Sequence, residues 1–131
     1  NEQVFSTYPI IFNVGSECYV RSIQKVNDDK SLLFYCAVEN GLVLSMGAKK
    51  DFYSELNLAY QDLENQLGKI SHCLLFECIL RKIEVESFDQ EQRAKIFNLH
   101  KKYNSIGFHT YGEQFCGLHV NQTLTGVAFG Y

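Results

Sequence analysis

The chain has 131 residues, of which 46% are hydrophobic and 21% charged, and its formal net charge is −3. These proportions are those of one globular domain and exclude wholesale disorder. The 12 basic residues form no stripe and the apolar runs are of strand length. The sequence therefore predicts neither a nucleic-acid partner nor a membrane span.

The cysteines indicate the cellular compartment, and the two ends of the chain indicate the domain organisation. An odd number of cysteines is scattered through apolar segments, at positions 18, 36, 73, 78 and 116. This pattern predicts reduced, mostly buried thiols in a reducing compartment. No secretion signal opens the chain, so we expect a cytoplasmic location. The abrupt start and the strand-like end at Tyr131 predict that residues 1–131 are one domain excised from a longer protein.

The first fifty residues have the pattern of strands. β-branched and aromatic residues or strict alternation predict strands over residues 4–14, 18–26, 31–39 and 42–46. Residues 27–30 are Asn and Asp followed by Lys, which predicts a turn. Asn40-Gly41 predicts a tight hairpin between the third and fourth of these strands.

The apolar spacing changes to three and four from Asp51 onward. It predicts an amphipathic helix over 51–67, with Asp51 as the N-cap and Gly68 as the left-handed terminator. Residues 72–80 are almost continuously apolar, as in a central strand covered on both faces.

A second helix is predicted over 88–103, opened by Ser87 or Asp89, each with Gln three residues later. Two more strands, over 106–113 and 119–131, surround a turn that contains Gly117. The predicted fold is α+β, with a largely antiparallel sheet of five to seven strands and two main helices packed on it.

The common catalytic motifs are absent from the sequence. It contains no nucleophile elbow, phosphate-binding loop, dinucleotide fingerprint or zinc-protease motif, so we expect a binding domain rather than an enzyme. A hydrolase or transferase using Cys78 or Glu113 is the alternative.

A metal site is a second alternative that the sequence does not favour. His109, Glu113, Cys116 and His119 lie within eleven residues, but no second ligand pair elsewhere completes a zinc tetrahedron. The pattern favours a hairpin turn with a buried cysteine and a solvent-facing histidine.

Glu77 is the one charged residue in the apolar run of residues 72–80. A buried carboxylate needs a partner, and Arg81 or Arg21 could supply it. Such a pair would either anchor the end of the strand or form the polar floor of a pocket.

The last hairpin carries polar side chains on one face. Alternation groups His109, Tyr111 and Glu113 on the first strand. It groups His119, Asn121 and Thr123 on the second. If Glu113 lies opposite His119, then Tyr111 meets Asn121, and His109 meets Thr123. Such residues are more typical of a recognition surface than of a solvated face.

Residues 107–126 carry a resemblance to a known family. The segments Thr-Tyr-Gly-Glu-Gln and His-Val-Asn-Gln-Thr-Leu-Thr-Gly resemble the C-terminal part of FIST domains, and so do Tyr19-Val20-Arg21 and the segment from Cys78 to Arg81. The resemblance implies an intracellular sensory domain that binds small ligands such as amino acids. It also implies coupling to a histidine kinase, a diguanylate cyclase or a chemotaxis receptor.

Two other functions follow from the same resemblance. Some members are described as haem proteins that sense nitric oxide; if this chain binds haem, His109 or His119 is the expected axial ligand. Eukaryotic relatives suggest a protein–protein interaction module whose sheet docks a partner.

We expect a ligand site beside the last hairpin, where an arginine grips a carboxylate while Glu113 and Tyr111 hold an ammonium group. Alternatively, Arg81 and Glu113 neutralise each other and fix the hairpin to the central strand. The predicted ligand-binding residues are Arg21, Cys78, Arg81, Tyr111, Gly112, Glu113, His119, Asn121 and Thr123.

Overall fold

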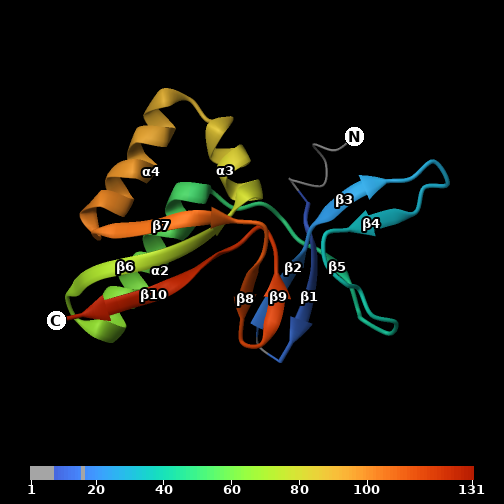
Figure 1. Cartoon of the computed structure of the whole chain (residues 1–131), viewed down its shortest axis with the longest axis horizontal. Helices are drawn as coiled ribbons and strands as arrows, with labels where there is room; N and C mark the ends of the chain where they lie inside the picture. Colours follow the sequence, from blue (N-terminus) through green and yellow to red (C-terminus); the bar gives the residue numbers. More distant parts are fainter. Residues whose placement is uncertain (1–7, 16) are drawn as a thin grey trace.

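A computed structural model describes residues 8–15 and 17–131. Within them it has three helices and ten strands, and the pairing is mostly antiparallel, which confirms the α+β class (Figure 1). The strands form four small sheets of two or three strands rather than one sheet of five to seven. None of the helices in this part is long and apolar enough to cross a bilayer.

The first half of the described chain contains two of these sheets. One has the order β2-β1-β5 and comprises β1 (Ile10–Val14), β2 (Glu17–Arg21) and β5 (Ser45–Met46). The other is the hairpin of β3 (Ile23–Val26) and β4 (Leu32–Phe34). The start of the first predicted strand, residues 4–7, lies outside the described residues.

The hairpin predicted at Asn40-Gly41 is wrong. The strands on either side of it do not pair with each other, because β4 pairs with β3 and β5 pairs with β1. Gly41 still turns the chain, with φ of 90°. A local turn motif thus predicted the bend but not the strand partners.

The second half is organised around β6 (Ile70–Cys78), the central strand of a sheet of order β10-β6-β7. β10 (Leu124–Gly130) is antiparallel to it and β7 (Ser105–Thr110) is parallel to it. A parallel neighbour requires a long crossover, and the segment between β6 and β7 supplies it as two helices.

The two predicted helices are confirmed with their caps. In α2 (Phe52–Leu67), the Asp51 carboxylate accepts a hydrogen bond from the Ser54 amide at 2.8 Å, and Gly68 ends the helix at φ 77°. In α4 (Gln90–Lys102), Asp89 caps the Gln92 amide at 2.8 Å.

Helix α3 (Ile79–Glu86) was not predicted. The strand expected to reach residue 80 ends at Cys78, and the chain turns directly into this helix. Five of its eight residues are the good helix formers Leu, Arg, Lys and Glu, and they include the i,i+4 pair Lys82–Glu86 at 3.5 Å. Arg81 therefore lies in the first turn of α3, four residues after Glu77, instead of on the same strand.

The main core lies between helices α2 and α4 and one face of the β10-β6-β7 sheet. Its buried residues are Leu56, Tyr60, Ile70, Cys73, Ile96, Leu99 and Tyr103. Figure 1 shows α2 behind these strands. The expectation that β6 is covered on both faces is wrong for the described residues, because Leu74 on the opposite face is 38% exposed.

The predicted long C-terminal hairpin is divided into four strands. β8 (Glu113–Phe115) and β9 (Leu118–Val120) form a short hairpin of their own between β7 and β10. Its turn is Cys116-Gly117, with φ of 49° and 79°, the two positive values of a type I′ turn. The turn has two residues rather than five, so Glu113 pairs with Val120 and not with His119.

Candidate functional site

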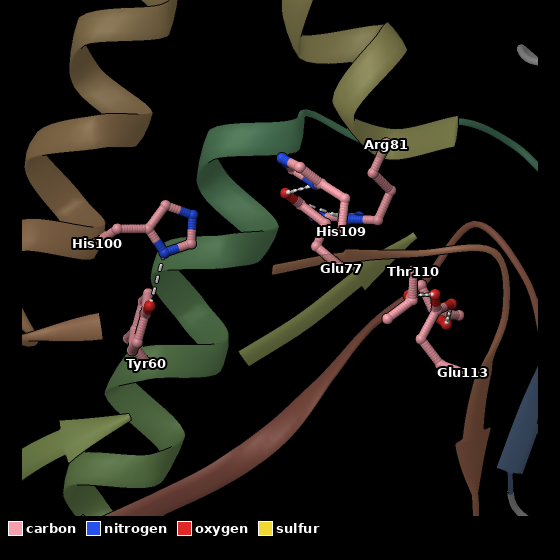
Figure 2. A network of polar contacts seen from close by, with 8 residues as sticks. Tyr60, Glu77, Arg81, His100, His109, Thr110 and Glu113 are labelled. Carbon is pink, nitrogen blue, oxygen red and sulfur yellow. Dashed lines mark hydrogen bonds and ion pairs between the residues drawn. The ribbon is translucent and has the colours of Figure 1, made fainter. Parts of the chain in front are cut away.

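Polar side chains gather where β6 ends and α3 begins (Figure 2). The Glu77 carboxylate lies 3.3 Å from Arg81 Nε and 3.6 Å from His109 Nδ1. The side chains of Glu77 and Arg81 are only 18% and 20% exposed. Arg81 thus compensates the charge that the sequence placed in the apolar run, and the predicted Glu77–Arg81 partnership is confirmed.

The guanidinium group of Arg81 is held in a fixed orientation. Its Nε is bonded to Glu77, and its central carbon lies 4.2 Å from the centroid of the Phe52 ring. Within residues 8–15 and 17–131, no side chain or carbonyl accepts a hydrogen bond from its two terminal nitrogens. The four N–H donors of these two nitrogens are therefore unused by the described part of the chain.

Arg81 lines a cavity of about 430 Å³ between α2, α3 and the segment before β10. Two ion pairs lie in its wall: Lys49–Glu84 at 2.7 Å and Lys50–Glu55 at 3.2 Å. The other lining residues include Pro9, Val20, Phe52, Gln122, Thr123 and Leu124. The volume lies within the range of about 300–1,000 Å³ that is typical of small-molecule sites.

The Glu113 carboxylate lies at the same end of the sheet, but its partners are hydroxyl groups rather than a cation. It is 5% exposed and accepts hydrogen bonds from the hydroxyls of Thr110 and Thr123, the latter at 2.7 Å. Cys78 lies between these threonines, pairing with Thr110 and donating its amide to Thr123 O at 3.0 Å. No lysine, arginine or histidine of the described chain forms an ion pair with Glu113.

Arg21 and Asn121 belong to the second, smaller core around Phe12, Tyr19 and Val120. Arg21 is 7% exposed, donates to the His119 carbonyl at 2.9 Å and lies 4.3 Å above the Phe12 ring. Its Nε and the Asn121 side-chain oxygen are buried without a hydrogen-bond partner in the described chain. Arg21 therefore ties β2 to β9, and it does not line the cavity beside Arg81.

Tyr111 lies in the link between β7 and β8, and His119 lies on the exposed side of β9. Tyr111 is 89% exposed, whereas its predicted partner Asn121 is 2% exposed, so the expected Tyr111–Asn121 contact is wrong. Gly112 has φ of 151°, and a Cβ built there would lie 2.1 Å from His119 Nε2. The His119 ring thus covers the backbone of Gly112, in space that only glycine leaves open.

The sequence model of the FIST C domain matches residues 1–116. The chain belongs to the FIST C domain family. This family is associated with signal-transduction sensory domains. Comparison with curated proteins and comparison with solved structures each gave no match.

The residues predicted to bind a ligand fall into three groups. Cys78, Glu113 and Thr123 come together, and Thr123 shares the cavity lining with Arg81. Arg21 and Asn121 lie in the second core. Tyr111 and Gly112 lie just before the β8–β9 hairpin, and His119 lies on it. The expected Arg81–Glu113 ion pair is wrong, because Arg81 pairs with Glu77.

Two residues that support the polar side chains at the end of β6 were not predicted from the sequence. Thr110 is a second donor to Glu113, and Phe52 supports Arg81. A continuous strand over 106–113 would have placed Thr110 and Glu113 on opposite faces. They meet because β7 ends at Thr110 and β8 begins at Glu113. Phe52 gave no indication beyond being the first apolar residue of α2.

Neither His109 nor His119 is placed as an axial haem ligand. His109 faces Glu77, and the cavity beside it measures about 190 Å³, below the range of typical ligand pockets. His119 packs on Gly112 and does not line the larger apolar groove next to the hairpin. Cys116, expected to be buried, is exposed at the turn, and no three candidate ligands among the described residues are arranged to hold a metal ion.

Proposed function

We propose that this FIST C domain is the ligand-binding part of an intracellular signal-transduction sensor, and that its ligand is a small molecule carrying a carboxylate, such as an amino acid. The observation that supports this most strongly is the orientation of Arg81. Its Nε is held by Glu77, its plane rests near Phe52, and its terminal nitrogens have no acceptor in the described chain. A guanidinium fork of this kind binds a carboxylate through two parallel hydrogen bonds.

The cavity beside Arg81 suits a ligand of amino-acid size. The lysines of its wall are paired with Glu84 and Glu55. Arg81 is the cation of this wall whose unused donors are held in one plane, because a lysine ammonium is a point charge on a flexible stem. Phe52 and Leu124 supply apolar wall for a ligand side chain.

Thr123 also lines this cavity, but its hydroxyl donates to Glu113 and has the strand parity of the face that points away from the helices. The proposal therefore rests on the contact between Arg81 and the carboxylate of the ligand.

The proposal assigns binding and no catalytic step to the domain. An output domain, such as a histidine kinase, a diguanylate cyclase or a chemotaxis receptor, would read the ligand-bound state. Five free cysteines, of which Cys18 and Cys116 are exposed, support a reducing compartment such as the cytoplasm.

Isothermal titration calorimetry tests the proposal with a panel of amino acids, matched amines without the carboxylate and matched acids without the amine. We expect amino acids to bind and the amines to lose affinity. Arg81→Lys should weaken binding about tenfold or more, because one ammonium cannot reproduce the bidentate contact. The lysine keeps a charge one turn from Glu77, so the free protein should remain folded.

Arg93→Lys is the matched control, because Arg93 is exposed on α4 and does not line the cavity. It should bind as the parent protein does. The proposal is wrong if no compound of the panel binds, or if Arg81→Lys binds the best ligand as tightly as the parent protein.

A further inference from the structure

The face of the β10-β6-β7 sheet that points away from the helices carries a continuous apolar surface. The pairing places side chains of the three strands directly beside one another: Leu74 between Ile106 and Val127, and Phe76 beside Phe108. We call this surface the open sheet face; its residues are His72, Leu74, Phe76, Ile106, Phe108, Thr125, Val127 and Phe129. None of the eight carries a formal charge of the Asp, Glu, Lys or Arg type.

The open sheet face is preorganised rather than loose. The rings of Phe76 and Phe108 meet edge to face at 5.2 Å, and those of His72 and Phe129 stack at 4.5 Å. These pairs hold the side chains of neighbouring strands in place across the sheet. A partner would therefore meet an ordered surface and lose little side-chain entropy by ordering it.

Large apolar side chains on this face are strongly exposed. Leu74, Ile106, Phe108, Val127 and Phe129 are between 38% and 71% exposed. At about 200 Å² for a fully exposed side chain of this size, the five expose roughly 500 Å² of mostly apolar surface. Contiguous apolar patches of this size mark interaction sites. The nearly continuous apolar run of β6 is also the pattern of a strand covered on both faces.

We infer that the open sheet face is the interface of a dimer of this chain, in which the sheets of two copies pack face to face. A standard interface buries about 800 Å² on each partner, and about 65% of a homodimer interface is apolar. The apolar part of such an interface is therefore about 500 Å² on each copy. The open sheet face exposes roughly the same apolar area. Two sheets packed in this way interdigitate their side chains at a separation of about 10 Å.

A second copy suits this face better than an unrelated protein. The face offers only His72 and Thr125 as polar side chains, so it has few groups with which to select a different partner. A two-fold axis that passes near Phe76 and Leu74 would pack the same apolar surface of each copy against the other. No charge would then be desolvated at the centre of the contact.

The β8–β9 hairpin sets the boundary of the interface. Thr110 and Thr123, which hold Glu113, have the same strand parity as Phe108 and Thr125, so the hairpin covers the end of the same face. Between the hairpin and the sheet lies a groove of about 470 Å³, lined by Tyr19, Phe115, Phe76 and Val127 among others. The edge of the second copy would fill this groove, against Phe115, which is 47% exposed.

The test is the mass of residues 1–131 in solution, measured by sedimentation over a broad range of protein concentrations without added ligand. We expect a species of twice the 15.1 kDa chain mass that dissociates on dilution. Phe108→Lys should weaken the dimer by about 100-fold or more, because each copy then buries an unpaired ammonium. Phe97→Lys is the matched control: Phe97 is 66% exposed, against 60% for Phe108, but it lies on α4.

Folding of each variant is checked by circular dichroism, and Ile106→Lys, at a position that is 71% exposed, provides a second disruption. Monomeric, folded Phe108→Lys or Ile106→Lys together with dimeric Phe97→Lys supports the interface. A parent chain that stays monomeric at every concentration overturns the inference, and so does a dimer that either disruptive variant leaves unchanged. Ligand binding is measured separately, so failure of the dimer and failure of the ligand proposal are distinguishable.

Discussion

Two carboxylates at the end of β6 are stabilised in opposite ways. Glu77 faces Arg81 and His109, so a cation compensates its charge. Glu113 is more buried and has only two threonine hydroxyls. Hydrogen bonds to charged groups contribute about 1.5–3 kcal/mol each, yet they do not cancel a buried charge. The cluster around Glu113 therefore depends strongly on each of its donors.

Replacing Thr123 with valine tests this dependence at a single hydroxyl. Valine keeps the branched shape and removes one of the two donors to Glu113. We expect Thr123→Val to lower the free energy of unfolding by about 1–3 kcal/mol, measured by urea denaturation. Thr125→Val is the control, because Thr125 lies on the same strand and its hydroxyl has no hydrogen-bond partner in the described chain; we expect a change within about 0.5 kcal/mol.

A double-mutant cycle with Glu113→Gln shows whether the cost acts through the carboxylate. Without the charge, the loss of the Thr123 hydroxyl should cost markedly less. An equal cost of Thr123→Val in both backgrounds would contradict a role for Thr123 as a donor to Glu113.

At the scale of elements, one hydrogen-bond network joins α2, α4 and β7. Tyr60 on α2 shares its hydroxyl with His100 Nδ1 at 2.8 Å and Ser105 Oγ at 2.6 Å (Figure 2 shows the His100 contact). The Tyr60 ring also stacks on Tyr103 at 4.2 Å. Burial raises the pKa of Tyr60 to about 12, so this hydroxyl keeps its proton at physiological pH.

Stability should depend on pH through His100. Burial lowers the pKa of His100 below its ordinary value of 6.5; Glu77 opposes this shift and Arg81 adds to it. Below pH 6.5 the unfolded chain therefore takes up a proton that the folded protein does not, and stability is lost as the pH falls. Urea denaturation at several pH values between about 7.5 and about 5 measures this loss.

His100→Gln removes the titrating group and keeps a polar side chain beside Tyr60. We expect the pH dependence of this variant to be flatter than that of the parent protein over the same range. If the variant loses stability just as steeply, other groups are responsible and His100 does not sense pH in this fold.

The elements differed in how far the sequence could predict them. Both long helices are encoded locally, by apolar spacing and by their caps. Asp51 and Gly68 were predicted correctly, and Asp89 was one of the two N-caps predicted for the second helix. The switch from β6 to α3 has no breaker at Cys78, because the apolar run continues through Ile79 and Leu80. The pairing of β7 with β6 in a parallel direction is a long-range choice that local patterns do not contain.

At the scale of the whole molecule, the same limit explains the candidate site. The residue types were predictable, since Cys78, Arg81, Glu113 and Thr123 were all selected from the sequence. The partner of Arg81, Glu77, was also predicted. The partners of Glu113 and Thr123 were not, because one register step in the last hairpin changes the neighbour of every side chain. The cavity beside Arg81 and the open sheet face arise only once the helices settle on one side of β6.

The central claim is that Arg81 receives the carboxylate of a ligand, and NMR of the arginine side chains tests it most directly. The chain has three arginines, Arg21, Arg81 and Arg93, so their Nε–H signals can be assigned from single substitutions to lysine. During titration with the tightest-binding amino acid found by calorimetry, the Arg81 signal should shift in proportion to occupancy while the Arg93 signal stays in place. Saturation of the protein with ligand and an unchanged Arg81 signal would contradict the account.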